Sequence, residues 1–145
     1  MTVTTADVVK ETLRVIQTGG WMTHMFQQME LENQAVGRHC IAGAMLQAQI
    51  NLGLPTAVNL RAAAEDERTE QMKTLTALVA ERVPLVFDLW GGAWTQYERM
   101  VGWNNRMADQ QSVEDVLKAV ISHLEGADVQ TQLEILCHAD QLVAA

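Results

Sequence analysis

The hydrophobic and polar positions of this chain alternate with a period close to that of an α-helix. Near the start, Val9, Leu13 and Ile16 recur every three or four residues, with charged residues between them. This spacing places apolar side chains on one face of a helix. Similar stripes occur over residues 72–83, 113–124 and 129–143. The pattern therefore predicts an all-α fold.

Residues 37–53 differ from these amphipathic segments, because apolar or small residues occupy nearly every side of the predicted helix. A helix that is apolar all round is usually buried. Gly43 and Ala48 are small enough for a neighbouring helix to approach closely, and Gly53 predicts the end of the helix. We therefore expect a bundle of about five or six helices around a buried central helix, 37–53. The whole chain, 1–145, is expected to form a single helical domain.

Short polar motifs predict where some of these helices begin. Thr4 and Asp7 have the spacing of a capping box, in which two side chains bond each other's backbone N–H groups. Ser112 and Asp115 have the same spacing, and residues 104–111 before them are typical of a polar loop. Capping therefore explains the carboxylate of Asp115 without a catalytic role.

Composition and charge narrow the classes of partner. Of the 145 residues, 48% are hydrophobic and 19% are charged, as in ordinary globular proteins. The formal net charge of −8 repels phosphate backbones and anionic lipids, which disfavours nucleic acids and membranes as partners. The N-terminus lacks the pattern of a signal peptide, and the two cysteines form no disulfide framework. These features predict a cytoplasmic protein.

Most of the aromatic residues lie between positions 87 and 103. Trp90, Trp94 and Tyr97 recur at helical spacing, so their rings line one face. A pair of glycines interrupts this stripe and predicts either a break in the helix or a helix that starts near Ala93. Core packing is the favoured interpretation, and the alternative is an exposed aromatic patch that binds a partner protein.

The Trp103-Asn104-Asn105 motif also has two interpretations. An indole beside two amides can bind a polar ligand by stacking and hydrogen bonding. It can equally anchor a loop, with the tryptophan buried and the amides bonded to backbone groups, and this interpretation is favoured. The candidate partner-binding residues are therefore Trp90, Trp94, Tyr97, Trp103 and Asn104.

Cys40 is the natural candidate for a nucleophile. It is expected in the first turn of the central helix, where the helix dipole lowers a thiol pKa, and His39 or His24 could supply a base. However, neighbouring side chains on a helix diverge by about 100°, and His24 can approach only if its segment folds back. A buried packing role for Cys40 is favoured, so we expect a protein that is not an enzyme. A cysteine-dependent hydrolase or transferase remains the alternative.

The sequence offers no pattern for a metal or a cofactor. Its histidines and cysteines show neither the Cys-x-x-Cys nor the His-Glu-x-x-His spacing of metal sites. Its glycines do not form a phosphate-binding loop. We therefore predict no metal and no cofactor.

Three separated motifs carry a resemblance to a known family. They are Gly20-Trp21, the segment from Gly37 to Ala44, and Trp103-Asn104-Asn105. Over about residues 8–122 the chain resembles a family of small uncharacterised proteins from actinobacteria and their phages. That family typically shows Gly-Trp, Gly-x-x-Cys-x-x-Gly-Ala and Trp-Asn-Asp, so Asn105 stands where an aspartate is usual. The resemblance implies an actinobacterial or phage origin and no defined activity.

Together these observations predict a non-enzymatic interaction protein. The resemblance suggests that it is phage-encoded and acts on a host protein, in which case the host cytoplasm is its compartment. A virion or assembly component that forms homo-oligomers through the aromatic face is a further alternative.

Overall fold

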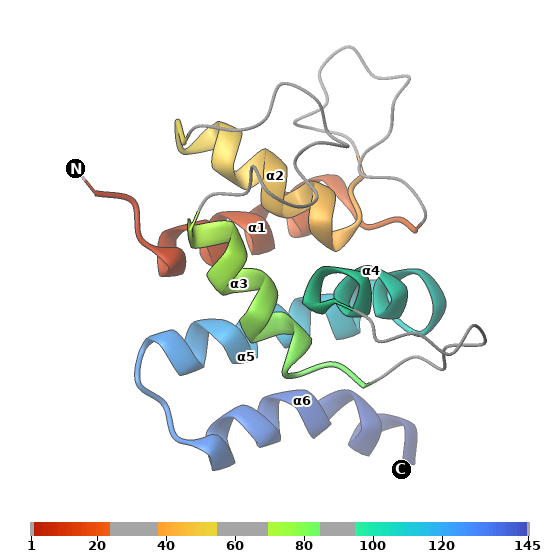
Figure 1. Ribbon diagram of the computed structural model, residues 1–145. Coiled ribbons are helices and arrows are strands. Elements are labelled where there is room, and N and C mark those ends of the chain that lie inside the picture. Colours follow the sequence, from red (N-terminus) through yellow and green to blue (C-terminus); the bar gives the residue numbers. More distant parts are fainter. Residues whose placement is uncertain (1, 24–37, 55–69, 85–94, 145) are drawn as a thin grey trace.

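The computed structural model describes residues 2–23, 38–54, 70–84 and 95–144, those from 137 onward by their backbone alone. Within these residues the fold is all-α and single-domain, as predicted (Figure 1). The described helices are α1 (Thr5–Gly19), α2 (Ile41–Asn51), α3 (Glu70–Ala80), α4 (Gln96–Arg106), α5 (Gln110–Leu124) and α6 (Val129–Ala144).

The helices pack in an order that differs from their order in the chain. Helix α1 packs against both α2 and α5, and α3 contacts α4, α1 and α5. Helix α6 packs chiefly against α5 and lies along the edge of the bundle, at the foot of Figure 1. Five helices therefore surround a common core, whereas α6 covers only one side of it.

The apolar stripes meet in this core. Val8, Val9, Val15 and Ile16 of α1 are buried, as are the inward residues of α5. The predicted inward stripe of α3 is confirmed at Met72, Leu75 and Val79, and Val83, just after the helix, is buried as well. No helix among the described residues is long and apolar enough to cross a membrane.

The predicted central helix is confirmed as buried, but it is shorter than 37–53. Residues 41–49 of α2 are all buried, whereas Ile50 and Asn51 are exposed. The helix begins only at Ile41, because Cys40 has an extended backbone and serves as its N-cap. At the other end Gly53 adopts a φ of 74°, the left-handed conformation that glycine accepts after a helix.

The predicted polar loop over 104–111 is wrong. Asn104 lies inside α4, and only Met107 to Asp109 separate α4 from α5. The N-cap of α5 is Asp109 rather than Ser112, because the Asp109 carboxylate accepts the N–H of Ser112 at 2.8 Å. In return the Ser112 hydroxyl accepts the N–H of Asp109 at 2.9 Å.

This shift of one turn changes the role of Asp115. The sequence placed Asp115 in a capping box, but it lies in the second turn of α5 and is buried. Its carboxylate therefore needs another explanation than helix capping.

The other predicted cap at the N-terminus is confirmed. Thr4 accepts the N–H of Asp7 at 3.2 Å, and Asp7 accepts the N–H of Thr4 at 2.9 Å. The hydrogen bond from the Thr4 N–H to the Asp7 carboxylate lowers the pKa of Asp7, because it favours the charged form. A Thr95–Glu98 capping box starts α4, so the helix begins at Gln96, slightly later than the predicted start near Ala93.

Candidate functional site

Asn104 lies where the three sequence motifs meet. Trp21, the segment His39 to Ile41, and Asn104 itself come from distant parts of the chain but are joined by hydrogen bonds. We call these residues the Asn104 junction. Trp103 beside it is 4% exposed and Asn104 is fully buried. The motifs therefore converge on one interior polar cluster.

The amide of Asn104 uses its full hydrogen-bonding capacity. Its Oδ1 accepts the indole Nε1–H of Trp21 at 2.8 Å and the backbone N–H of Ile41 at 3.1 Å. Its Nδ2 donates to the carbonyl of Met22 at 3.4 Å and to Oδ1 of Asn105 at 3.1 Å. An asparagine amide offers two acceptor and two donor sites, so every site is occupied. This pattern explains how a polar side chain is tolerated inside the core.

Two backbone segments of the junction, around Trp21 and His39, are hydrogen-bonded to each other. Trp21 and His39 pair as an isolated parallel bridge, with Met22 N–H donating to His39 O at 3.1 Å and His39 N–H donating to Gly20 O at 3.2 Å. Gly20 has φ 94° and ψ 174°, a conformation essentially restricted to glycine. A Cβ atom there would also lie 3.1 Å from Cγ of Arg38.

Cys40 caps α2 from inside the protein. Its sulfur accepts the N–H of Gly43 at 3.3 Å, and Asn104 accepts the neighbouring N–H of Ile41. These contacts satisfy two of the N–H groups that a helix start leaves unpaired. Burial raises the pKa of the Cys40 thiol, and the hydrogen bonds to its sulfur only partly oppose this shift.

The candidate bases for Cys40 receive little support. His39 is fully buried, and its backbone is held in the bridge to Trp21. His24 lies outside the described residues. A buried thiol with a raised pKa is the opposite of an activated nucleophile, which needs a thiolate open to substrate. The geometry therefore favours the packing and capping role of Cys40.

The aromatic candidates fall into three groups. Trp90 and Trp94 lie outside the described residues. Tyr97 is partly buried and packs against the core. Trp103 and Asn104 are buried at the junction, which favours their role as anchors over direct contact with a partner.

The described residues also bear on metal binding. Among them, no group of three or more histidine, cysteine, aspartate or glutamate side chains could hold a metal ion.

A second feature, on α6, was not expected from the sequence. Val129 is 69% exposed and Leu133, one turn later, is 48% exposed. With Leu136 they line one flank of α6, beside a cavity of about 340 Å³ whose other wall is Glu81 and Arg82 after α3. We call Val129, Leu133 and Leu136 the α6 surface.

The contact between α6 and the end of α3 holds this surface in place. One guanidinium nitrogen of Arg82 donates to Leu78 O at 2.7 Å, and another donates to Oε1 of Gln132 at 2.8 Å. Gln132 is itself buried. A signal for the surface was present in the sequence, since Val129 and Leu133 lie on a different side of the helix from Ile135, and a helix packed at an edge cannot bury both sides.

Comparison with known proteins identifies a family for most of the chain. A family model described as a family of unknown function, DUF6197, matches residues 1–123. No curated protein matches, and no solved structure matches. The matched segment includes the whole Asn104 junction and ends within α5, so α6 lies beyond it.

Proposed function

The chain belongs to the DUF6197 family of unknown function. We propose that it is a non-enzymatic protein that binds a partner protein through the α6 surface. The exposure of Val129 and Leu133 carries this proposal. Large apolar side chains grouped on one face of a helix favour contact with another protein, because that contact removes them from water.

Position also supports the α6 surface over other exposed apolar residues. Among the described residues, the exposed large hydrophobic side chains are Ile50, Met107, Val129 and Leu133. Ile50 lies in the last turn of α2 and Met107 follows α4, so each stands alone. Single exposed residues are normal on protein surfaces, whereas two on one helical face beside a cavity are less so.

The buried chemistry supports a binding role rather than catalysis. Cys40 is the reactive residue that the sequence singled out, and it is enclosed with a raised pKa. The amide of Asn104 is fully occupied by internal hydrogen bonds and has no capacity left for a substrate.

The resemblance to actinobacterial and phage proteins suggests which organism supplies the partner protein. We propose that the protein is phage-encoded and that its partner is a protein of the host cytoplasm. The three sequence motifs support the origin of the partner, whereas the exposure of Val129 and Leu133 supports the binding surface.

Site-specific photo-crosslinking tests the proposal. A photoreactive amino acid at position 133, in protein produced in an actinobacterial host, is expected to form one specific adduct with another protein. The same amino acid at position 50 serves as the matched control, because Ile50 is similarly exposed and belongs to α2, which lies across the bundle from α6 (Figure 1). The adduct should disappear when Val129→Glu is added, since a charge on the α6 surface opposes burial.

The outcomes separate the alternatives. An adduct of the chain with itself, together with a dimer mass in solution, supports an assembly component instead. Equal adducts from positions 133 and 50, or none from position 133, contradict the proposed surface.

Thiol alkylation tests the enzymatic alternative. In a Cys137→Ser background, Cys40 of the native protein is expected to react with iodoacetamide at least about a hundredfold more slowly than in the denatured chain, because its sulfur is reached only when the fold opens. Rapid labelling of Cys40 at neutral pH would instead favour the cysteine-dependent hydrolase or transferase.

A further inference from the structure

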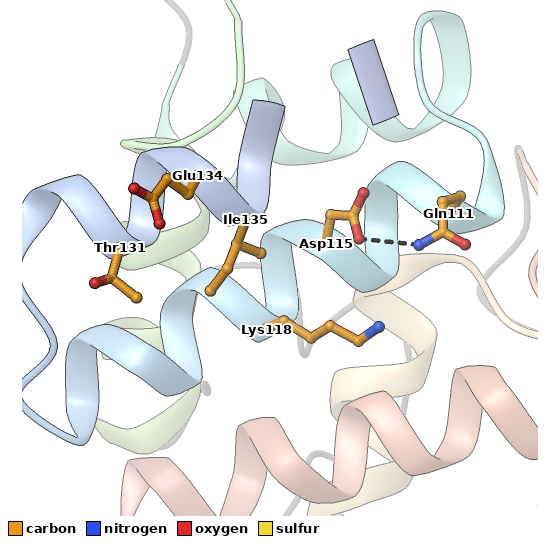
Figure 2. A pocket seen from close by; sticks show the side chains of 6 residues that line it. All are labelled: Gln111, Asp115, Lys118, Thr131, Glu134 and Ile135. Atoms are coloured by element: carbon orange, nitrogen blue, oxygen red, sulfur yellow. Dashed lines mark hydrogen bonds between the residues drawn. The ribbon is translucent and has the colours of Figure 1, made fainter. Parts of the chain in front are cut away.

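A second groove lies between α5 and the opposite flank of α6 (Figure 2). Its volume is about 490 Å³, within the size range of pockets that hold small molecules. The lining residues are Gln111, Asp115, Lys118, Thr131, Glu134 and Ile135. We call this the α5–α6 groove.

The groove contains a buried carboxylate that is only half satisfied. Asp115 is 6% exposed, and its Oδ1 accepts the Nε2–H of Gln111 at 2.9 Å. Its Oδ2 is also buried, and no described group donates a hydrogen bond to it. A buried carboxylate oxygen without a donor is energetically costly. A ligand in the groove with a donor group would satisfy this oxygen once the Asp115 side chain turns toward it.

The other groups in the groove define the kind of donor. Glu134 supplies a second carboxylate, and in Figure 2 the apolar side chain of Ile135 lies between it and Asp115. Lys118 also lines the groove, but within the described residues its ammonium is not within 4 Å of a carboxylate. Since the described residues offer no cluster for a metal ion, an organic cation suits the groove better.

We propose that the α5–α6 groove binds an aliphatic diamine. One ammonium group donates to the free oxygen of Asp115, the hydrocarbon chain lies against Ile135, and the second ammonium group is attracted to Glu134. Because Oδ2 is covered, the Asp115 side chain turns slightly toward the groove as the ligand enters. Lys118 competes with the ligand, because its own ammonium can swing toward Asp115 when the groove is empty.

This groove is independent of the proposed protein-binding surface. Thr131, Glu134 and Ile135 face one flank of α6, whereas Val129, Leu133 and Leu136 line the other. A change confined to one flank should therefore leave binding at the other unchanged.

Calorimetric titration with putrescine tests the proposal, with butanediol as the uncharged probe of the same length. Putrescine is expected to bind and butanediol is not. Asp115→Asn keeps the shape and the acceptor for Gln111 but removes the charge, and it should weaken putrescine binding at least about tenfold. Lys118→Gln removes the competing cation and should tighten binding several-fold.

Glu134→Gln tests the second contact. In this variant putrescine should bind no better than butylamine, which has a single ammonium group. Ile50→Ser, at an exposed position that does not line the groove, serves as the control and should leave putrescine binding unchanged.

Three results would overturn the proposal: no binding of putrescine to the folded protein, equal binding to wild type and Asp115→Asn, or equal binding of putrescine and butanediol. If Asp115→Asn fails to fold, Lys118→Gln tests the proposal in its place. An unchanged or weakened affinity of Lys118→Gln for putrescine would show that Lys118 does not compete with the ligand for Asp115, and would overturn the proposal. Backbone amide shifts on titration must also map to Thr131 and Ile135.

Discussion

Asn104 is polar and fully buried, whereas Val129 is apolar and 69% exposed. Both depart from the usual placement of side chains, in which polar groups face water and large apolar groups face the core. At the Asn104 junction four hydrogen bonds from three chain segments compensate for the burial of the amide. At the α6 surface no described side chain covers Val129, and in the proposed function a partner protein would cover it.

The fold therefore stabilises the buried amide of Asn104 but leaves the apolar side chain of Val129 in water. The junction lies wholly within the segment that matches the family, and it joins the start of α2 to α4 and to the end of α1. We infer that it maintains the fold. The α6 surface lies beyond the matched segment, at the edge of the bundle, where a binding surface can vary without disturbing the core.

The largest effect on stability is expected when the side-chain amide of Asn104 is removed. Asn104→Ala should lower the free energy of unfolding by about 2–4 kcal/mol, because it leaves the buried N–H groups of Trp21 and Ile41 without their acceptor. Urea denaturation measures the change. The control is Asn51→Ala, since Asn51 is exposed, and it should cost less than about 1 kcal/mol. Similar losses in the two variants would show that the junction has no special structural role.

The backbone of the junction predicts a smaller effect. Gly20→Ala should cost about 1–3 kcal/mol, because alanine rarely adopts the backbone angles of Gly20 and its Cβ would press on Arg38. Gly53→Ala is the matched control, since Gly53 also has a positive φ but nothing lies within 4 Å of an added Cβ. It should cost only about 1 kcal/mol. Denaturant midpoints that rank the two variants in the reverse order would contradict this account of Gly20.

The attachment of α6 gives a prediction that depends on pH. Asp128 accepts the N–H of Thr131 at 2.9 Å, and this backbone hydrogen bond lowers its pKa from the ordinary value of 3.8. The folded state therefore holds its proton less tightly than the unfolded state. The stabilisation is complete above about pH 4 and is lost as the pH falls through the lower folded pKa.

Asp128→Ala should accordingly lower the melting temperature by about 2–5 °C at pH 7, and by progressively less as the pH falls below about 4. Asp128→Asn retains a capping oxygen and is expected to melt close to wild type at pH 7. Thermal melts followed by circular dichroism across this pH range test the sign. A penalty for Asp128→Ala that grows on acidification would contradict the capping role.

The smallest effect on stability is expected at the α6 surface. Leu133→Ser should change the free energy of unfolding by less than about 0.5 kcal/mol, because the side chain is already 48% exposed. Ile50→Ser, at the other exposed site, should behave in the same way. A loss above about 1 kcal/mol at Leu133 would show that this residue packs within the fold, and would remove the main support for the proposed binding surface.

The features that were predicted correctly from the sequence depend on residues that lie close together in the chain. Helical periodicity predicted the apolar faces of α1, α3 and α5, and the Thr4–Asp7 spacing predicted the start of α1. These features depend on contacts within one or two turns of helix, which is why a pattern of neighbouring residues predicts them. The all-round apolar character of residues 41–49 likewise predicted the burial of α2.

The tertiary structure decided the roles of the polar residues. Asn104 has the sequence signature of a loop residue, but α2 presents an unpaired N–H beside it and makes a buried amide favourable. Ser112 and Asp115 have the spacing of a cap, yet Asp109 starts α5 one turn earlier and leaves Asp115 buried against α6. The exposure of Val129 and Leu133 depends on which flank of α6 packs against α5. Each outcome depends on which helices become neighbours in space, because a hydrogen-bond partner or a covering side chain can come from any part of the folded chain.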